Sequence, residues 1–372
     1  MPSSSESICC GNLQLEKEAN TRGKEKRFIS ASSPGKILLI GGYSILEKGN
    51  IGYVVAIDKR VRSRIETIDS KEVLFELPQF IGAGSEKFKF MKACADLAKE
   101  YFGQFGNAKI SSVNDEGFTF GGGRLKSGFG SSAAAVVSIS AVICRHFGIS
   151  DVEFIHKFSQ LAHSRAQGKV GSGFDVACST YGSIVYSRYS PKLLEENARS
   201  ALEKKWDFEI RKMSLPSNLK LVVGFTRKSA STVNLLKNVN EWKKNHAQEY
   251  SVLMKKMDIE NEKAIESLAK MESEMSEKGM KRFRKAFNEG RKLAKILGEK
   301  CNSPIESDEH TRLLKIAEEN GAVCAKSPGA GGGDSLVAIS EQDCAGRIEK
   351  AWEEKGLVII DVKPSGEGLL WE

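Results

Sequence analysis

The sequence predicts an α+β protein built of two lobes. Its first part alternates short apolar strands with helices, and a Lys/Glu-rich region with helical spacing follows over residues 240–300. The closing part reads as strand, helix and strand, which suits an α+β sandwich. A chain of 372 residues has enough material for two domains. We therefore expect a disordered segment over 1–27, an N-terminal lobe over 28–217 and a C-terminal lobe over 218–372.

The N-terminal lobe is expected to be rich in strands. Residues 28–40 read F-I-S-A-S-S-P-G-K-I-L-L-I, which predicts two short strands broken at Pro34-Gly35. Residues 199–217 are expected to cross the surface to the second lobe. The remaining predicted elements are strands at 51–57, 61–68, 108–113, 117–120 and 182–186, and helices at 87–102, 151–167 and 174–178.

The C-terminal lobe is expected to open with an apolar strand at 219–225. Residues 240–300 should form two or three helices, interrupted near Lys278-Gly279. They lack a sustained heptad, so we expect them to pack on the lobe's own sheet rather than to form a coiled coil. The remaining predicted elements are a helix at 308–320, a glycine-rich loop at 327–334, a strand at 335–339, a helix at 341–355 and a strand at 357–362.

Composition limits the classes of function. The formal charge is +8, from 56 basic and 48 acidic residues, and many of these charges alternate as on a solvated helix face, so nucleic-acid binding is not expected. No apolar run reaches the roughly 20 residues of a membrane span, and residues 1–27 lack the apolar core of a signal peptide. The eight cysteines show no C-x-x-C spacing, which fits a cytoplasmic protein without zinc or disulfides.

The stretch from Gly121 to Cys144 carries the strongest chemical signal. It reads G-G-G-R-L-K-S-G-F-G-S-S-A-A-A-V-V-S-I-S-A-V-I-C, a glycine-rich basic loop that leads into a buried helix from Ser132. A helix start preceded by glycines binds anions through free N–H groups and the positive end of the dipole. Lys126 adds positive charge, Ser131 and Ser132 suit capping, and a serine hydroxyl can reach a phosphate-bound Mg²⁺. The stretch therefore resembles a cradle for a nucleoside triphosphate.

Three other interpretations of this loop compete. A P-loop would need G-x-x-x-x-G-K-[S/T], and the loop has no Gly-Lys pair. Residues 128–133 fit the dinucleotide fingerprint G-x-G-x-x-A, but that fingerprint should follow an apolar strand, which G-G-G-R-L-K-S is not. The loop could also be a glycine turn that only caps a core helix. Such a turn would not explain three further unusual segments, at 34–36, 171–175 and 328–334.

Taken in order, these segments resemble the motifs of the GHMP small-molecule kinases, named for galactose, homoserine, mevalonate and phosphomevalonate. S-P-G-K-I-L-L-I-G-G-Y is similar to the first motif, K-S-G-F-G-S-S-A-A to the second and P-G-A-G-G-G-D-S to the third. Within the family, the sequence is most similar to the phosphomevalonate kinase subgroup of eukaryotic type. The similar features are G-G-Y after the first motif, the segment A-Q-G-K-V-G-S-G-F-D-V-A, and Asp334 in the third motif. The resemblance covers the chain from Phe28 onward and implies the two-lobed GHMP kinase fold.

The resemblance implies ATP-dependent phosphorylation of 5-phosphomevalonate to 5-diphosphomevalonate in isoprenoid and sterol synthesis. It implies Lys36 and Asp175 as catalytic residues and Ser132 as a contact for Mg²⁺ bound to ATP. The expected ATP-binding residues are Lys126, Ser127, Gly128, Phe129, Gly130, Ser131, Ser132 and Ala133. The expected substrate-binding residues are Lys36, Tyr43, Lys169, Ser172, Gly173, Gly331 and Gly332, with Arg188 and Arg227 as weaker candidates.

Two alternatives stay open at this point. The acceptor could be mevalonate or another small alcohol, or the protein could be a sensor of the same fold that binds ligand without catalysis. A sensor should have lost Lys36, Asp175 or the Ser131-Ser132 pair, and this sequence keeps all of them. The five histidines show no metal-ligand spacing and are interpreted as structural. The sequence carries no indication of the oligomeric state.

Overall fold

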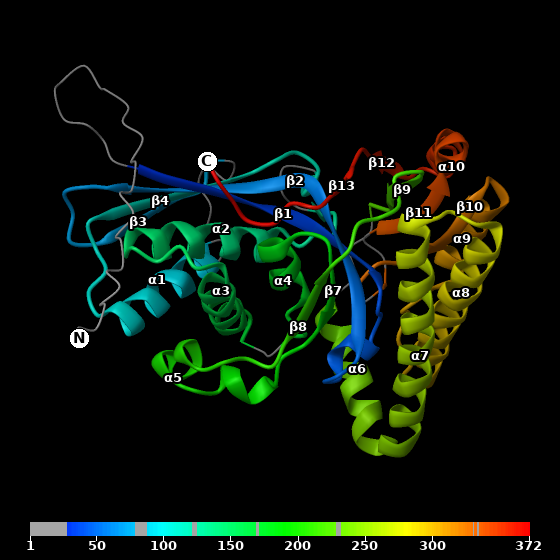
Figure 1. The fold of residues 1–372 in the computed structure, drawn as a ribbon, viewed down its shortest axis with the longest axis horizontal. Coiled ribbons are helices and arrows are strands. Elements are labelled where there is room, and N and C mark those ends of the chain that lie inside the picture. The colour runs from blue at the N-terminus through cyan, green and yellow to red at the C-terminus, as the bar shows by residue number, and fades with distance from the viewer. Residues whose placement is uncertain are drawn as a thin grey trace, which may run out of the picture.

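The computed structural model describes residues 28–78, 88–120, 125–168, 171–227, 232–329, 331–332 and 335–372. The predicted disordered segment 1–27 lies outside this part of the chain. The model has mixed helix and strand, arranged as two sheets with helices packed against them (Figure 1). The α+β class predicted from the sequence is confirmed.

The larger sheet belongs to the N-terminal part of the chain. Its strands follow the order β14-β1-β2-β4-β3, with β13 and β7 also on β2 and with β8 on β7. A separate two-stranded ribbon is formed by β5 and β6. The bounds are β1 Phe28–Ile40, β2 Ile51–Thr67, β3 Val73–Glu76, β4 Ala108–Asn114, β5 Thr119–Phe120, β6 Leu125–Lys126, β7 Ile184–Ser187, β8 Glu209–Lys212, β13 Pro364–Ser365 and β14 Leu370–Trp371.

Four helices cover one face of this sheet, on the left of Figure 1. They are α1 Lys89–Phe102, α2 Ser131–His146, α3 Val152–Gln167 and α4 Phe174–Tyr181, and the short α5 Ala198–Glu203 lies beyond them. Helix α2 is buried along almost its whole length, because small Ala and Ser side chains let its neighbours approach closely. Its Val136, Ile139 and Val142 share one apolar cluster with residues of α1, α3 and β4.

The second sheet follows the order β10-β11-β9-β12, and two long antiparallel helices, α7 and α8, pack against it. Leu268 and Phe283 share a core cluster with Val223 and Val337, which confirms packing on the lobe's own sheet. The bounds are β9 Leu219–Phe225, α6 Thr232–Asn245, α7 Ala247–Ser273, α8 Glu277–Lys300, α9 Asp308–Glu319, β10 Ala322–Lys326, β11 Ser335–Glu341, α10 Gln342–Glu353 and β12 Val358–Ile360.

Several element predictions were wrong in detail. The strand over 28–40 is continuous, and a register shift between Pro34 and Lys36 accommodates the proline. The predicted strands 51–57 and 61–68 are one strand, β2. The crossing at 199–217 contains α5 and β8. The helical region breaks at 274–276 instead of Lys278-Gly279, because Ser276 accepts a hydrogen bond from the N–H of Gly279 and starts α8.

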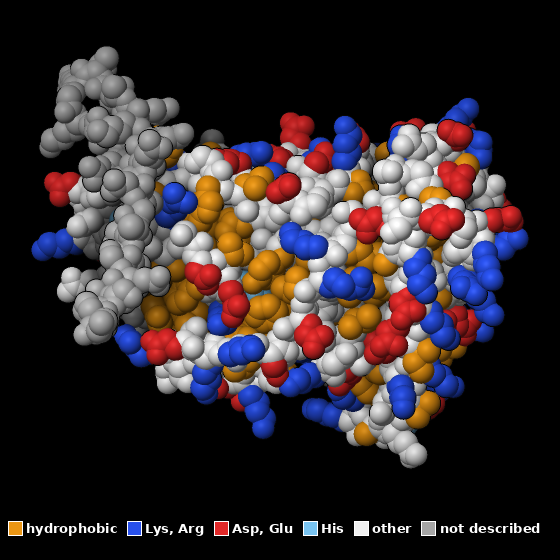
Figure 2. Space-filling model, viewed as in Figure 1, with side chains coloured by type: hydrophobic (Ala, Val, Ile, Leu, Met, Phe, Trp, Pro, Cys, Tyr) orange, Lys and Arg blue, Asp and Glu red, His pale blue; other side chains and the backbone are white. Residues whose placement is uncertain are grey.

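The end of the chain returns to the first sheet. Ser365 pairs with Ala56 on β2, and Leu370 pairs with Ser32 on β1, so residues 364–371 lie on the N-terminal sheet. The division of the chain into lobes at 217/218 remains a prediction. None of the helices that the structure describes is both long and apolar enough to cross a membrane. On the face shown in Figure 2, basic and acidic side chains are interspersed.

Candidate active site

Helix α2 begins directly after a glycine turn. Gly128 and Gly130 have φ values of +80° and +74°, in the left-handed region that favours glycine. Gly130 is the N-cap, and among the described residues no side chain caps the helix, so the predicted serine capping is not formed. Ser131 and Ser132 instead occupy the first turn, which has no carboxylate. The start of α2 therefore presents its positive dipole end to an anionic ligand.

Lys36 joins the first strand to this loop. Its backbone N–H donates to the carbonyl oxygen of Phe129 at 2.9 Å, and its amine donates to the carbonyl oxygen of Gly128 at 2.9 Å. Lys36 is only 8% exposed. A Cβ at Gly130 would lie 2.8 Å from Cε of Lys36 and would force the lysine side chain to move, and the φ of +74° there also favours glycine. Strand β1 and residues 126–133, the phosphate loop, are thus one unit with the lysine amine at its surface.

A cavity of about 570 Å³ opens between the two lobes next to Lys36. The N-terminal sheet, α3 and α4 form one side, and α6, α7 and the residues Pro328, Gly329 and Gly331 form the other. This volume suits a small-molecule site. The predicted site residues in its wall are Lys36, Tyr43, Ser127, Gly128, Ser172, Gly173, Asp175 and Gly331.

Other predicted residues lie elsewhere. The side chains of Phe129 and Ala133 are buried in the core, and Lys126 is exposed on β6. Gly332 donates its N–H to the carbonyl oxygen of Ile305 at 3.1 Å. Lys169 lies outside the described residues. Of the weaker candidates, Arg188 lines the cavity and Arg227 is exposed after β9.

The loop at 171–175 is held by buried polar groups. The side-chain amide of Gln160 on α3 donates to the carbonyl oxygen of Gly173 at 2.8 Å, and the Tyr189 hydroxyl donates to Oε1 of Gln160 at 3.1 Å. Arg188 donates to the carbonyl oxygens of Gly171, at 2.9 Å, and Leu46. Gly173 has a φ of +78°, and a Cβ there would lie 2.7 Å from Oε1 of Gln160. These contacts fix the loop on the wall of the cavity.

Asp175 stands in the first turn of α4, where the dipole favours a negative charge. Its Oδ1 accepts a hydrogen bond from the N–H of Val176 at 3.0 Å. The ring of the preceding Phe174 lies 5.6 Å from the amine of Lys36. The two predicted catalytic residues, from β1 and α4, therefore face one cavity.

Several residues of this cavity were not predicted from the sequence. His163, interpreted as structural, lines it from α3, and its Nε2 lies 3.3 Å from Oγ of Ser132 and 3.1 Å from Nε2 of Gln167. Its ring also stacks on Phe90 at 5.5 Å between centroids. No sequence signal separates His163 from a core histidine, because its position depends on how α3 packs beside α2.

A second missed group closes the cavity from the C-terminal lobe. Lys243 on α6 and the hydroxyl of Tyr250 on α7 both donate to Oε1 of Glu47, at 2.5 and 2.7 Å. Burial alone would raise the pKa of Glu47, but the hydrogen bonds from Lys243 and Tyr250 outweigh it and lower the pKa. Tyr43 packs beside them in an apolar cluster, is 2% exposed, and has a pKa raised by burial.

Comparisons with known proteins agree with this geometry. The family model described as GHMP kinases N terminal domain matches residues 89–183, and the model GHMP kinases C terminal matches residues 263–357. A phosphomevalonate kinase of Saccharolobus solfataricus is 36% identical over 93% of this chain and 99% of the relative. A phosphomevalonate kinase of Candida albicans is 26% identical over 92% of this chain and 97% of the relative.

A solved structure has the same fold. Streptococcus pneumoniae phosphomevalonate kinase, in complex with phosphomevalonate and AMPPNP, superposes with a TM-score of 0.74 at 20% identity, over 91% of this chain and 100% of that chain. The family models match both parts of the chain, and the relative from Saccharolobus solfataricus matches nearly all of it. The chain therefore belongs to the GHMP kinase family.

Proposed function

We propose that this protein is a phosphomevalonate kinase, which transfers the γ-phosphoryl group of ATP to 5-phosphomevalonate and releases ADP and 5-diphosphomevalonate. The observation that carries the proposal is the meeting of Lys36, the phosphate loop and the loop at 171–175 in one cavity. The similarity to phosphomevalonate kinases over more than nine-tenths of the chain supports the choice of acceptor.

In phosphoryl transfer the protein mainly positions the two substrates and supplies positive charge near the transferred group. The start of α2 would hold the phosphates of ATP through backbone N–H groups. Lys36 is fixed on that loop and would place its charge between the transferred group and the acceptor. One oxygen of the acceptor phosphate forms the new bond to the γ-phosphorus, and the bond from that phosphorus to the β,γ-bridging oxygen breaks.

The acceptor itself needs little activation. A phosphate monoester has a second pKa near ~6 and is mostly a dianion at pH 7, so no proton has to be removed from it. This favours a role for Asp175 in keeping Lys36 charged and oriented rather than as a general base. An alcohol acceptor would instead depend on a base for its hydroxyl proton.

Mg²⁺ is expected to enter with ATP. Within the described ranges, no group of three His, Cys, Asp or Glu side chains could hold a metal by itself. The hydroxyl of Ser132 at the start of α2 suits a contact to a metal carried by the nucleotide phosphates, and the metal would neutralise their charge.

The six cysteines that the structure describes are free, which supports the cytoplasmic location expected from the sequence.

The test is ADP release with a panel of acceptors at saturating ATP. We expect turnover with 5-phosphomevalonate and little with mevalonate. Preference for mevalonate would favour the alternative of an alcohol kinase. A mevalonate kinase of Thermococcus sibiricus is also among the relatives, at 26% identity. Binding without any turnover would favour the sensor.

A further inference from the structure

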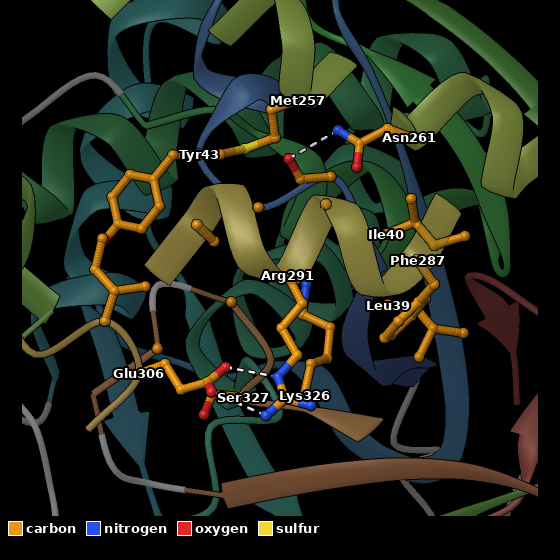
Figure 3. Close-up of a pocket in the computed structure, with 17 residues that line it drawn as sticks. Leu39, Ile40, Tyr43, Met257, Asn261, Phe287, Arg291, Glu306, Lys326 and Ser327 are labelled. Carbon is orange, nitrogen blue, oxygen red and sulfur yellow. Dashed lines mark hydrogen bonds and ion pairs between the residues drawn. The ribbon is translucent and has the colours of Figure 1, made fainter. Parts of the chain in front are cut away.

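A second, smaller cavity adjoins the main one. It has a volume of about 40 Å³, and Figure 3 draws the residues that line it. Gly42, Tyr43, Gly329 and Gly331 belong to the walls of both cavities. A water needs roughly 10–15 Å³ measured in this way, so the space suits a few waters or one carboxylate group. Its floor comes from α7, α8 and the end of β10, and the polar side chains in it are Asn261, Arg291, Glu306, Lys326 and Ser327.

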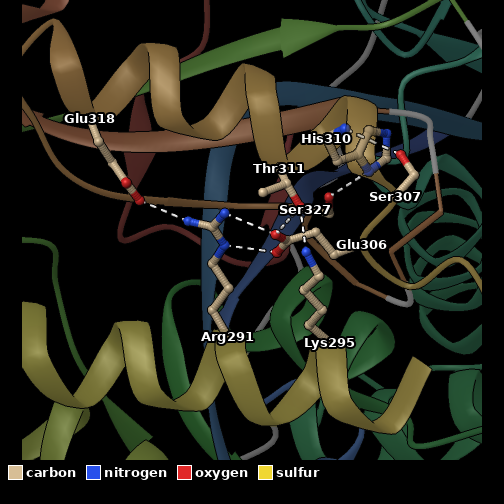
Figure 4. A network of polar contacts seen from close by, with 8 residues as sticks. All are labelled: Arg291, Lys295, Glu306, Ser307, His310, Thr311, Glu318 and Ser327. Atoms are coloured by element: carbon tan, nitrogen blue, oxygen red, sulfur yellow. Dashed lines mark hydrogen bonds and ion pairs between the residues drawn. The ribbon is translucent and has the colours of Figure 1, made fainter. Parts of the chain in front are cut away.

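Most of these polar groups already have partners. Arg291 donates to both carboxylate oxygens of Glu306, at 2.7 and 2.9 Å, and to Glu318 at 2.7 Å (Figure 4). Glu306 also accepts from the hydroxyl of Thr311 at 2.9 Å. Burial alone would raise the pKa of Glu306, but the hydrogen bond and charge of Arg291 lower it. The Arg291–Glu306 pair therefore forms a rigid part of the cavity wall, and its hydrogen-bonding groups are engaged with each other and with their neighbours.

The neutral groups are likewise engaged. The side-chain amide of Asn261 donates to the carbonyl oxygen of Gly41 at 3.1 Å and to Oγ of Ser44 at 2.7 Å. Oγ of Ser327 lies 3.0 Å from Nδ1 of His310. Neither side chain forms a hydrogen bond with the amine of Lys326 within the described residues.

Lys326 differs from its neighbours. It ends β10, directly before the glycine-rich loop, and its side chain lines the small cavity (Figure 3). No hydrogen bond or ion pair joins its amine to any residue that the structure describes. Burial lowers its pKa to about 8, so the amine is still mostly protonated at neutral pH. Lys326 is half-buried and its side chain reaches the cavity wall, so an anion in the cavity would gain a charge-assisted hydrogen bond from its amine.

The acceptor supplies such an anion. Given the proposed function, 5-phosphomevalonate carries two anionic ends, and its phosphate must lie beside Lys36 and the phosphate loop. The other cations of the described cavity wall have protein partners, since Arg188 binds backbone carbonyl oxygens and Lys243 binds Glu47. We propose that the small cavity is the subsite for the carboxylate of the acceptor and that the ammonium group of Lys326 binds it.

This contact is remote from the transferred phosphoryl group and holds substrate and transition state alike. It should therefore act on KM for the acceptor and leave kcat nearly unchanged. A charge-assisted hydrogen bond of this kind corresponds to about 10–100-fold in affinity. Lys326→Met replaces the ammonium group by an apolar thioether of similar volume and should not destabilise the fold, because it removes a half-buried charge that has no protein partner within the described residues.

The experiment compares Lys326→Met with Lys295→Met, using 5-phosphomevalonate and its C1 carboxamide as acceptors. Lys295 is the matched control, because its amine belongs to the same network through Thr311 at 3.0 Å but does not line the cavity. We expect Lys326→Met to raise KM for the acid by about 10–100-fold, with KM for ATP and the melting temperature unchanged. For the wild type, KM for the carboxamide should exceed KM for the acid by the same factor. For Lys326→Met, the two acceptors should have similar KM values.

Each other outcome is decisive. An unchanged KM for the acid in Lys326→Met would mean that the cavity holds only water. A rise in KM of equal size for acid and carboxamide would assign Lys326 a structural role and overturn the subsite. Failure of the proposed function is distinguishable, because wild type would then not turn over 5-phosphomevalonate at all, and the subsite would be wrong with it.

Discussion

The amine of Lys36 donates a hydrogen bond to the carbonyl oxygen of Gly128 at 2.9 Å, across 92 positions of sequence. This bond fixes a cation on the loop that precedes α2, where the phosphates of ATP are proposed to bind. The loop and the lysine are therefore positioned together, before any substrate enters.

Replacing Lys36 by methionine should reduce the single-turnover rate by about 10²–10³-fold, the usual loss when one preorganised contact to the transition state is removed. ATP should still bind, because the helix start and its N–H groups remain. Calorimetric ATP titration beside single-turnover measurements tests this. If ATP affinity collapsed while the rate at saturation survived, Lys36 would be a nucleotide anchor only.

Ser132→Ala should lower kcat by about 10²–10³-fold with little change in melting temperature, because it removes a hydroxyl that is proposed to contact the phosphates or their metal. Ser131→Ala tests the neighbouring hydroxyl of the same turn, which is also expected in the ATP site but has no described contact to His163. Steady-state rates over a range of Mg²⁺ concentrations provide the measurement. A Ser132→Ala enzyme with normal kcat and normal Mg²⁺ dependence would remove Ser132 from the mechanism.

Gly173→Ala should cost both stability and activity. The alanine would have to adopt a φ of +78°, and its Cβ would lie 2.7 Å from Oε1 of Gln160. Gly148→Ala is the matched control, with a φ of +83° and no atom within 4 Å of the new Cβ. The control should lose about 1–2 kcal/mol of unfolding free energy, from backbone strain alone. Gly173→Ala should lose more and should also raise KM for the acceptor; equal effects in the two variants would refute the packing argument.

Asp258 on α7 connects the lobes by accepting a hydrogen bond from the N–H of Ile51 at 3.0 Å. Burial, and then the charge of Glu262, raises its pKa from 3.8 to about 6. Because the folded pKa is above the unfolded value, its contribution to stability is fully present below about pH 4 and is lost as the pH rises through about 6.

Asp258→Asn keeps the acceptor oxygen and removes the charge. With allowance for the partial exposure of this side chain, it should stabilise the protein at pH 8 by about 1 kcal/mol, and by less at pH 5. Thermal unfolding of both proteins at the two pH values measures this difference. A variant less stable than wild type at pH 8 would contradict the direction of the pKa shift.

The motifs could be predicted from the sequence because each depends on local chemistry. Glycines before a buried helix indicate an anion site, and the structure puts Gly128 and Gly130 in the left-handed region there. The strand over 28–40 was predicted with a break because Pro34 lacks an N–H, and long-range pairing with β2 overrides that local signal.

Contacts between distant segments could not be predicted. His163 and Lys243 lie on helices, and only helix packing brings them to the cavity. The strands β13 and β14 have two residues each, too few for a periodic pattern, and they form because β1 and β2 offer them partners. The charge network of Arg291, Glu306 and Glu318 likewise unites two helices and a loop.

If the acceptor is a phosphate, the acid limb of the pH profile belongs to the substrate. With 5-phosphomevalonate, kcat/KM should fall as the pH drops through ~6, the second pKa of the phosphate. Asp175→Asn should be slower but keep this limb. A limb that disappears together with the carboxylate would make Asp175 the general base of an alcohol kinase.

The choice of acceptor is the central claim, and ADP release by the wild-type protein with 5-phosphomevalonate and with mevalonate tests it most directly. Mevalonate lacks the nucleophilic dianion and leaves cations of the cavity unpaired, so we expect its kcat/KM to be at least ~10²-fold lower. Turnover of mevalonate equal to or above that of 5-phosphomevalonate would contradict the proposed function and leave only the family.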